Sequence, residues 1–280
     1  MKKLLTIIAA ACMINSAEAQ LKTPAPSPSQ TITQAFGLGE IKIEYSRPSA
    51  KSRKIFGDLV PFGKVWRTGA NQSTKITFSD DVKVGGTEVK AGTYALYTTP
   101  NMGEWDIMLY KDLTLGGDVA EYKVENELMR IKAKAQDTKD FMETFSIQVN
   151  NITGTSCSVD LVWEMTRVSI PVTTVIDDKI MKSIDKEMTA DKRPYFQAAN
   201  YYLENGKDLN KAAEWINKAV EINPSAYWIW HAKAKINMKQ GNKAEAMKAA
   251  ETSMAKAKED KNDDYVKMNE KIIAEIKAMK

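Results

Sequence analysis

Histidine and cysteine, the side chains that serve many nucleophilic and metal sites, are scarce in this sequence. Among 280 residues there is one histidine, His231, and there are two cysteines, Cys12 and Cys157. A Ser-His-Asp triad or a histidine-rich metal site would have to use His231 itself. That residue lies beside Trp228 and Trp230 in a helical pattern, which favours a structural or surface role. We expect neither a metal ion nor another cofactor.

Cys157 lies in the segment TSCSVDLVWEM, where apolar and polar residues alternate as they do in a strand. In such a place a thiol behaves as a small apolar side chain. A nucleophilic cysteine would need a histidine partner, and His231 belongs to a distant helical region. We therefore expect Cys157 to lie in a core.

The sequence also lacks the short motifs of nucleotide and redox chemistry. It contains no GxxxxGK[ST] and no CxxC. Its formal net charge is only +4, and acidic and basic residues are interleaved along the chain. Nothing global therefore supports a nucleic-acid partner or a membrane-surface role, and we expect no nucleic-acid partner.

Long apolar runs are missing, apart from one short run at the N-terminus. Two lysines precede the apolar segment Leu4–Ala11, and Ala17-Glu18-Ala19 follows as a small-x-small cleavage sequence. This order is typical of a secretory signal peptide over residues 1–19, so we predict an exported protein, periplasmic or secreted. The alternative is a lipoprotein signal with Cys12 as the acylated residue. No segment is long and apolar enough to predict a transmembrane helix.

The middle of the chain has the pattern of an all-β domain. Residues 20–29 are rich in Pro and Ser and predict an extended, mobile linker. Residues 30–174 alternate apolar and polar positions, with tight turns expected at Gly37-Leu38-Gly39, Gly85-Gly86 and Pro100–Gly103. Many short strands with close turns predict an antiparallel β-sandwich or flattened barrel.

The C-terminal part has helical periodicity. Apolar residues four apart, from Ile176 to Met188, predict a connecting helix over residues 175–190. Residues 191–280 then repeat themselves at an interval of 34 or 35 positions. The matched pairs are Tyr195 and Trp230, Ala199 and Ala234, Gly206 and Gly241, and Ala212 and Ala246. This period and these residue types resemble the tetratricopeptide repeat. The whole chain is thus predicted to be an α+β multidomain protein.

Three carboxylates are candidates for acid–base chemistry. Glu104 and Asp106 are two positions apart on one expected strand, so both side chains point to the same side of the sheet. Glu164 stands alone, with Arg167 as its expected local partner. Acids on the outer face of a sheet are often simply solvated, and that alternative stays open for all three.

Residues 47–71, RPSAKSRKIFGDLVPFGKVWRTGAN, form the most informative stretch. It is too long for a hairpin turn and too rich in aromatic residues for a solvated linker, and ordered long loops are often functional. We expect its large apolar residues to fold back onto the sandwich and anchor the loop. These are Ile55, Phe56, Leu59, Val60, Phe62 and Trp66. Its cations would then project from an ordered frame: Arg47, Lys51, Arg53, Lys54, Lys64 and Arg67.

An arginine held in such a frame can grip a carboxylate, sulfate or phosphate through two hydrogen bonds. The predicted ligand-binding residues are Arg47, Lys54, Lys64, Arg67 and Asn71. The structural alternative pairs Arg67 with Asp58, Asp106 or Glu44 and uses Asn71 to cap a turn.

Three pieces of sequence carry a family resemblance. The loop of residues 47–71 is followed by TFSDDVKVGGTEVKAGTYALYTTP and then by EWDIMLYKD. In this order, over residues 30–174, they resemble the exported bacterial family called domain of unknown function 2911. Helical repeats are a common companion of that domain. The resemblance implies an all-β exported domain with no established activity, so it supplies no catalytic residues.

Two functions from different classes are compatible with these observations. The first is a non-enzymatic binding or scaffold protein, whose β domain holds a small anionic or glycan-like ligand or an acidic protein surface. Its helical repeats would bind a partner protein. The alternative is a cell-envelope hydrolase that takes its acid or base from Glu104, Asp106 or Glu164 and uses Arg67 to stabilise negative charge.

Overall fold

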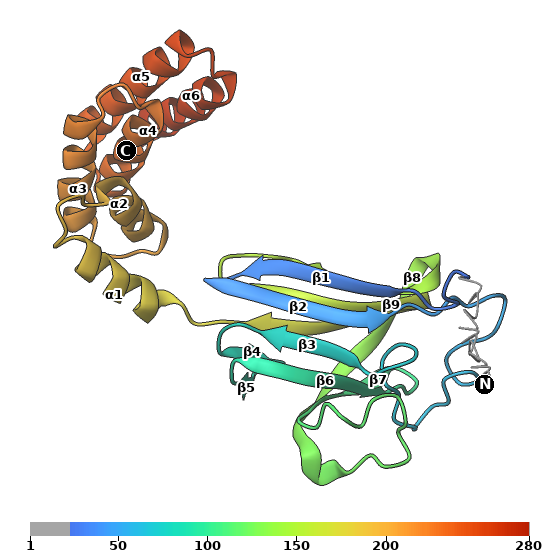
Figure 1. The fold of residues 1–280 in the computed structure, drawn as a ribbon. Coiled ribbons are helices and arrows are strands. Elements are labelled where there is room, and N and C mark those ends of the chain that lie inside the picture. The colour runs from blue at the N-terminus through green and yellow to red at the C-terminus, as the bar shows by residue number, and fades with distance from the viewer. Residues whose placement is uncertain (1–22, 280) are drawn as a thin grey trace, which may run out of the picture. The chain divides into compact units, whose positions relative to one another are not determined.

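The computed structural model describes residues 23–279, and the predicted signal peptide lies outside them. The chain divides into two compact units, with the boundary between Ile176 and Asp177. The first unit contains the strands and the second contains the long helices (Figure 1). The prediction of an α+β chain with an N-terminal β domain is confirmed.

The β unit is built on one open antiparallel sheet, which has nine strands within residues 23–279. Their order across the sheet is β1-β2-β3-β6-β7-β8-β9-β4-β5. The strands are β1 (Ser29–Phe36), β2 (Gly39–Ser46), β3 (Thr74–Phe78), β4 (Val82–Val84), β5 (Thr87–Val89), β6 (Gly92–Thr99), β7 (Glu104–Tyr110), β8 (Glu127–Asn150) and β9 (Ser156–Thr173). A 3-10 turn, η1 (Val124–Asn126), precedes β8. β1 and β5 are the edge strands, so the sheet does not close into a barrel.

The three predicted hairpins are present. β1 pairs with β2, β4 with β5 and β6 with β7, all antiparallel. Gly37 shows why the first turn needs glycine, because its φ of +62° lies in the left-handed region and a Cβ there would press against Thr174. The turn residues thus fix the register of these strands.

Two long strands replace four expected segments. The segments from ELMRIKAKAQ to TRVSIPVTT merge into β8 and β9, of 24 and 18 residues. The first part of β8 pairs with β7 and the rest with β9, with register shifts between Asp137 and Ser146. Such irregularities bend a strand, and the bend folds the sheet over a common core. β8 and β9 pass behind β1 and β2 in Figure 1.

The core of the β unit holds side chains from every strand and from the long loop. At one end it contains an aromatic cluster in which Trp66 stacks on Trp163 with ring centroids 5.9 Å apart. Phe56, Trp105 and Phe145 meet these rings edge-on or tilted. Cys157 is buried in this core, as predicted, and burial raises the pKa of its thiol to about 11.

The helical unit begins with α1 (Asp177–Glu187), which occupies most of the predicted connecting helix. Two antiparallel pairs follow, α2 (Tyr195–Glu204) with α3 (Leu209–Ile222) and α4 (Tyr227–Lys239) with α5 (Lys243–Glu259), and α6 (Asp263–Ala278) ends the unit. The small residues that repeat in the sequence are fully buried where helices cross: Ala199, Ala212, Ala234 and Ala246. The predicted helical repeats are therefore present.

His231 has a structural role in this unit. It is buried, and its Nδ1 lies 2.9 Å from Oδ1 of Asn269 on α6. Asn269 in turn donates to Ser253 on α5, which donates to the carbonyl of Tyr227. Burial lowers the pKa of His231. The ring is thus a neutral part of a buried polar network.

Candidate functional site

The long loop of residues 47–71 is ordered along its length by the strands that it crosses. Its first residues run beside β8, where Ala50 N donates to Glu143 O and Phe145 N donates to Pro48 O. Farther on, Trp66 forms a two-way backbone bridge with Thr98 at the end of β6. These backbone hydrogen bonds fix the loop near its beginning and near its end.

Apolar anchors hold the loop, but fewer than the sequence predicts. Ile55, Phe56 and Val60 are buried in the β core, and Trp66 packs against it. Leu59 and Phe62 were expected to be anchors, yet 44% and 40% of their surfaces are exposed. The expectation was wrong for these two. Leu59 lies in the tight bend that the Phe56–Val60 bridge closes, and the ring of Phe62 lies over Gly57 at the surface of the loop.

Glu164 anchors the same loop from the sheet. Its Oε1 accepts a hydrogen bond from Ile55 N at 2.9 Å, and its Oε2 accepts one from Phe56 N at 3.4 Å. The residue sits at a bulge in β9 with φ of +51°, which directs the carboxylate at the loop. The local pairing with Arg167 expected from the sequence is replaced by these two contacts.

The segment from Trp66 to Asn71 is tightly hydrogen-bonded. Trp66 Nε1 donates to Gly69 O at 3.1 Å, and the Thr74 hydroxyl donates to Thr68 O. Thr68 is completely buried and has φ of +55°. Such a backbone conformation persists only where the surroundings hold it, so this segment is a rigid platform.

A groove of about 470 Å³ lies over this platform. Its lining combines apolar and aromatic side chains with five polar side chains that carry hydrogen-bond donors. The lining residues are Ser27, Pro48, Arg53, Leu59, Val60, Pro61, Lys64, Val65, Trp66, Arg67, Gly69, Ala70, Asn71 and Trp163. Three of them are cations and, among the described residues, no carboxylate lines the groove. A fixed positive charge without a nearby acid favours an anionic ligand.

Backbone carbonyls fix both guanidinium groups of the groove. Arg53 donates from Nε to Ala50 O at 2.9 Å and from Nη2 to Ser49 O at 2.8 Å. Arg67 donates from Nη1 to Gly117 O at 2.8 Å. The structural alternative of an ion pair between Arg67 and Asp58, Asp106 or Glu44 is not what the structure shows. Positioned in this way, the two groups lose little freedom when they bind an anion.

The structure brings together three of the five predicted ligand-binding residues. Lys64, Arg67 and Asn71 line the groove, whereas Arg47 and Lys54 do not. Arg47 donates instead to Phe145 O and to the Ser146 hydroxyl. Lys54 is exposed and precedes the buried Ile55.

Asn71 both lines the groove and holds neighbouring segments together through hydrogen bonds. It lines the groove, has φ of +60°, and donates from Nδ2 to Ser46 Oγ and Ser27 O. The end of the predicted linker is thereby fixed to the domain, since Arg47 N also donates to Pro28 O.

Three groove residues escaped the sequence-based prediction. Arg53 was recognised as a loop cation, but Lys54 was chosen in its place, because nothing in the sequence shows which of the two neighbours faces the groove. Trp66 was expected only as an anchor, although it is half-buried and also lines the groove. Trp163 lies about a hundred positions away, and only its alternation within a strand could have placed it in this layer.

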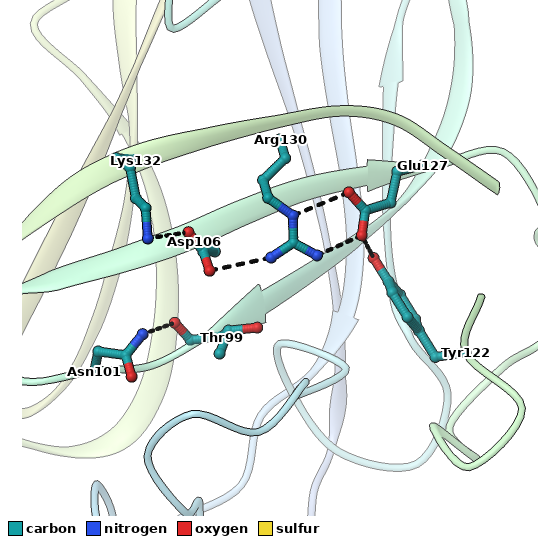
Figure 2. Close-up of polar contacts among 7 residues, drawn as sticks. All are labelled: Thr99, Asn101, Asp106, Tyr122, Glu127, Arg130 and Lys132. Carbon is teal, nitrogen blue, oxygen red and sulfur yellow. Dashed lines mark hydrogen bonds and ion pairs between the residues drawn. The ribbon is translucent and has the colours of Figure 1, made fainter. Parts of the chain in front are cut away.

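The carboxylates of the hydrolase hypothesis lie elsewhere. Asp106 sits between Arg130 and Lys132 on the face of β7 and β8, and Arg130 continues to Glu127, which accepts from Tyr122 (Figure 2). Glu104 is exposed on the same strand. Neither of them, nor Glu164, lines the groove of Arg67. The arrangement of an acid facing Arg67 and Asn71 is therefore not formed.

The charged network of Figure 2 reaches Tyr122 through Glu127. Tyr122 lies near the end of the segment of residues 111–123, here called the strap. The strap covers Tyr97 and Tyr110 on the outer face of the sheet. Burial and the hydrogen bond to Glu127 raise the pKa of Tyr122, so the phenol stays protonated and donates. The network therefore holds the strap against strands β7 and β8.

A second hollow of about 420 Å³ lies between the loop and the turn after β6. Its lining includes Phe56, Phe62, Met102 and Trp105, and Asp137 is the one ionisable side chain that residues 23–279 contribute to it. Its electrostatic character is opposite to that of the groove. Over residues 23–279 there is no cluster of acidic, histidine or cysteine side chains fit for a metal ion, and no helix in that range could cross a membrane.

The profile of a family described as "Protein of unknown function (DUF2911)" matches residues 27–172, which is more than half of the chain. The chain belongs to the DUF2911 family. A tetratricopeptide repeat profile matches residues 193–225, which cover α2 and α3. No curated protein and no solved structure gives a match. A DUF2911 domain followed by such a repeat suggests a protein-binding scaffold.

Proposed function

We propose that this DUF2911 protein is a non-enzymatic binding protein with two binding surfaces. The helical unit binds a partner protein, which the tetratricopeptide match suggests. The groove of the β unit binds a small anion that carries a flat or ring-shaped body, such as an acidic sugar. One observation carries the second part: Arg53, Lys64 and Arg67 share a groove floored by Trp66 that no carboxylate of the described chain enters.

Each component of the groove suits a different part of such a ligand. The two fixed guanidinium groups present several N–H donors to a carboxylate, sulfate or phosphate. Trp66 and the prolines of the lining offer apolar surface to a ring. The hydrolase alternative has less support, because Glu164 binds loop amides, Asp106 binds the cations of Figure 2, and Glu104 does not line the groove.

The first prediction concerns Lys64, the one groove cation that no hydrogen bond or ion pair ties to the described part of the chain. Titration calorimetry of the full chain with glucuronate should show binding, and glucose, which lacks the carboxylate, should bind more weakly. Lys64→Ala should weaken glucuronate binding roughly fivefold, as for the loss of one exposed ion pair. Sulfate and phosphate, titrated in parallel, test whether the anion alone suffices.

Lys54→Ala is the matched control for this experiment. It removes the same charge from the same loop, but outside the groove, so the affinity should change less than about twofold. Equal losses for the two variants would show a diffuse charge effect and contradict the groove. No binding of any of these anions would also contradict it.

We further propose export. The support is the order of two lysines, a short apolar run and Ala17-Glu18-Ala19 at the N-terminus. The protein isolated from its native host should then begin at Gln20. A mature chain that begins with an acylated Cys12 would establish the lipoprotein alternative.

A further inference from the structure

The two edges of the sheet differ in how they are protected. β5 is three residues long, includes Glu88 and is followed by Lys90. Short length and charge are devices that keep an edge strand from pairing with another chain. β1 at the opposite edge is eight residues long, and it contains no charged residue and no proline. Its register with β2 is unbroken from Ser29 to Phe36, so no bulge disturbs it.

The outer side of β1 has no strand partner among residues 23–279. Its exposed positions carry small polar or apolar side chains, Thr31, Thr33 and Ala35. The positions between them, including Ile32, are half-buried, and Ile32 packs against the core. An uncharged, regular strand of this length exposes a row of backbone N–H and C=O groups that another strand can pair with.

The order of residues in β1 identifies which strand fits. Residues 30–34 read Gln-Thr-Ile-Thr-Gln, which is the same in both directions. When two copies pair antiparallel about a two-fold axis at Ile32, Gln30 of one copy lies opposite Gln34 of the other and Thr31 opposite Thr33. Opposite residues in an antiparallel pair share a face of the sheet. Each threonine therefore lies opposite a threonine on the exposed face. Each glutamine lies opposite a glutamine on the half-buried face, where the two Ile32 side chains also meet.

We propose that β1 is the dimer interface of this protein, and that its occupant is β1 of a second copy. The contact is isologous, with the same strand contributed by both subunits. It joins two sheets into one continuous sheet across the axis. Glutamine–glutamine and threonine–threonine pairs supply hydrogen bonds, and no charge has to lose its hydration. The proposal does not depend on the anion groove, because no residue of β1 lines that groove.

The register allows a charge-swap test on the full chain. Sedimentation of the wild type over roughly 1–100 µM should show a concentration-dependent shift toward twice the monomer mass. T31K/T33K places two lysines opposite each other in both pairs and should weaken dimerisation roughly tenfold or more. T31K/T33E instead places opposite charges together in both pairs and should restore the dimer. T87K on β5 is the matched control and should leave the mass unchanged.

Both positions are exposed, so the variants should keep the circular dichroism spectrum of the wild type. Loss of the dimer should lower the melting temperature only by the stabilisation that association supplies. A wild type that stays monomeric throughout would overturn the proposal. Dimers that persist in T31K/T33K would place the interface elsewhere and overturn it as well. Loss of the dimer in both double variants would exclude the axis at Ile32 and with it the proposed pairing.

Discussion

The arginines of the long loop stabilise the fold through hydrogen bonds, and they also supply positive charge. Arg47, Arg53 and Arg67 all donate to backbone carbonyls, at Phe145, Ala50 and Gly117. An alanine at Arg47 or Arg67 would take the side-chain donor from a partly buried carbonyl, which costs about 1–3 kcal/mol. At Arg53 the loss is smaller, because Ala50 O still accepts the backbone N–H of residue 53. Loss of binding in such a variant would then be mixed with loss of stability. Lys64, exposed and unconstrained, separates the two effects.

Glu164 gives a prediction at the same scale. Glu164→Ala removes the acceptor of two loop N–H groups and should lower the free energy of unfolding by about 1–3 kcal/mol. The measurement is a denaturant titration of the full chain. Glu104→Ala is the control, because Glu104 is an exposed strand residue and its loss should change stability by less than about 0.5 kcal/mol. Equal stability of both variants would refute the anchoring role of Glu164.

His231 gives a pH prediction. Its pKa in the folded chain lies below the ordinary 6.5, because burial disfavours the charged ring. The unfolded chain therefore binds a proton first as the pH falls. Stability from this residue is present above about pH 6.5 and is lost as the pH drops below that value toward the folded pKa. His231→Gln cannot titrate and should flatten the decline.

The test is thermal unfolding of wild type and His231→Gln between roughly pH 7.5 and pH 5. The difference in melting temperature between the wild type and His231→Gln should change with pH, because all other groups titrate alike in the two proteins. A constant gap over this range would show that His231 has the same pKa in both states.

Among the elements, the strap of residues 111–123 is fixed by close backbone contact to the groove platform. A Cβ on Gly117 would overlap the carbonyl oxygen of Asn71, and backbone yields less easily than a side chain. Gly117→Ala should therefore destabilise the β unit by about 1–3 kcal/mol, as overpacking does. Gly154→Ala meets nothing within 4 Å and is the control. Unchanged melting of Gly117→Ala would mean that the strap does not pack as described.

The elements also mark where sequence reasoning succeeds. Hairpins were predictable because Gly37, Gly85-Gly86 and Pro100–Gly103 specify turns locally. The helical repeats were predictable because period and small residues recur. The merging of four segments into β8 and β9 was not predictable. The alternation of apolar and polar residues continues on both sides of a bulge, so it does not show where a strand bends.

The groove shows the same limit more sharply. Lys64, Arg67 and Asn71 are near one another in the chain, so composition alone could group them. The contribution of Trp163 and the pinning of Arg67 by Gly117 depend on contacts between distant strands. The placement of Glu104, Asp106 and Glu164 outside the groove of Arg67 is also a tertiary fact, and the sequence alone does not contain it.

For the whole molecule, the main expectation is that two units unfold separately. The buried clusters of the described chain draw either on residues before Ile176 or on residues after Asp177, never on both. Calorimetry of the full chain should therefore show two thermal transitions. Gly117→Ala should lower the β transition alone, and acid pH should act through His231 on the helical transition. A single transition that both changes shift equally would contradict this.

We propose above that the groove over Trp66 holds a small anion. The most direct test is a crystal structure of the full chain grown with saturating glucuronate. We expect the carboxylate within hydrogen-bond distance of Arg53, Lys64 or Arg67 and the sugar ring against Trp66. An empty groove, or glucuronate bound only at other surfaces, would contradict it.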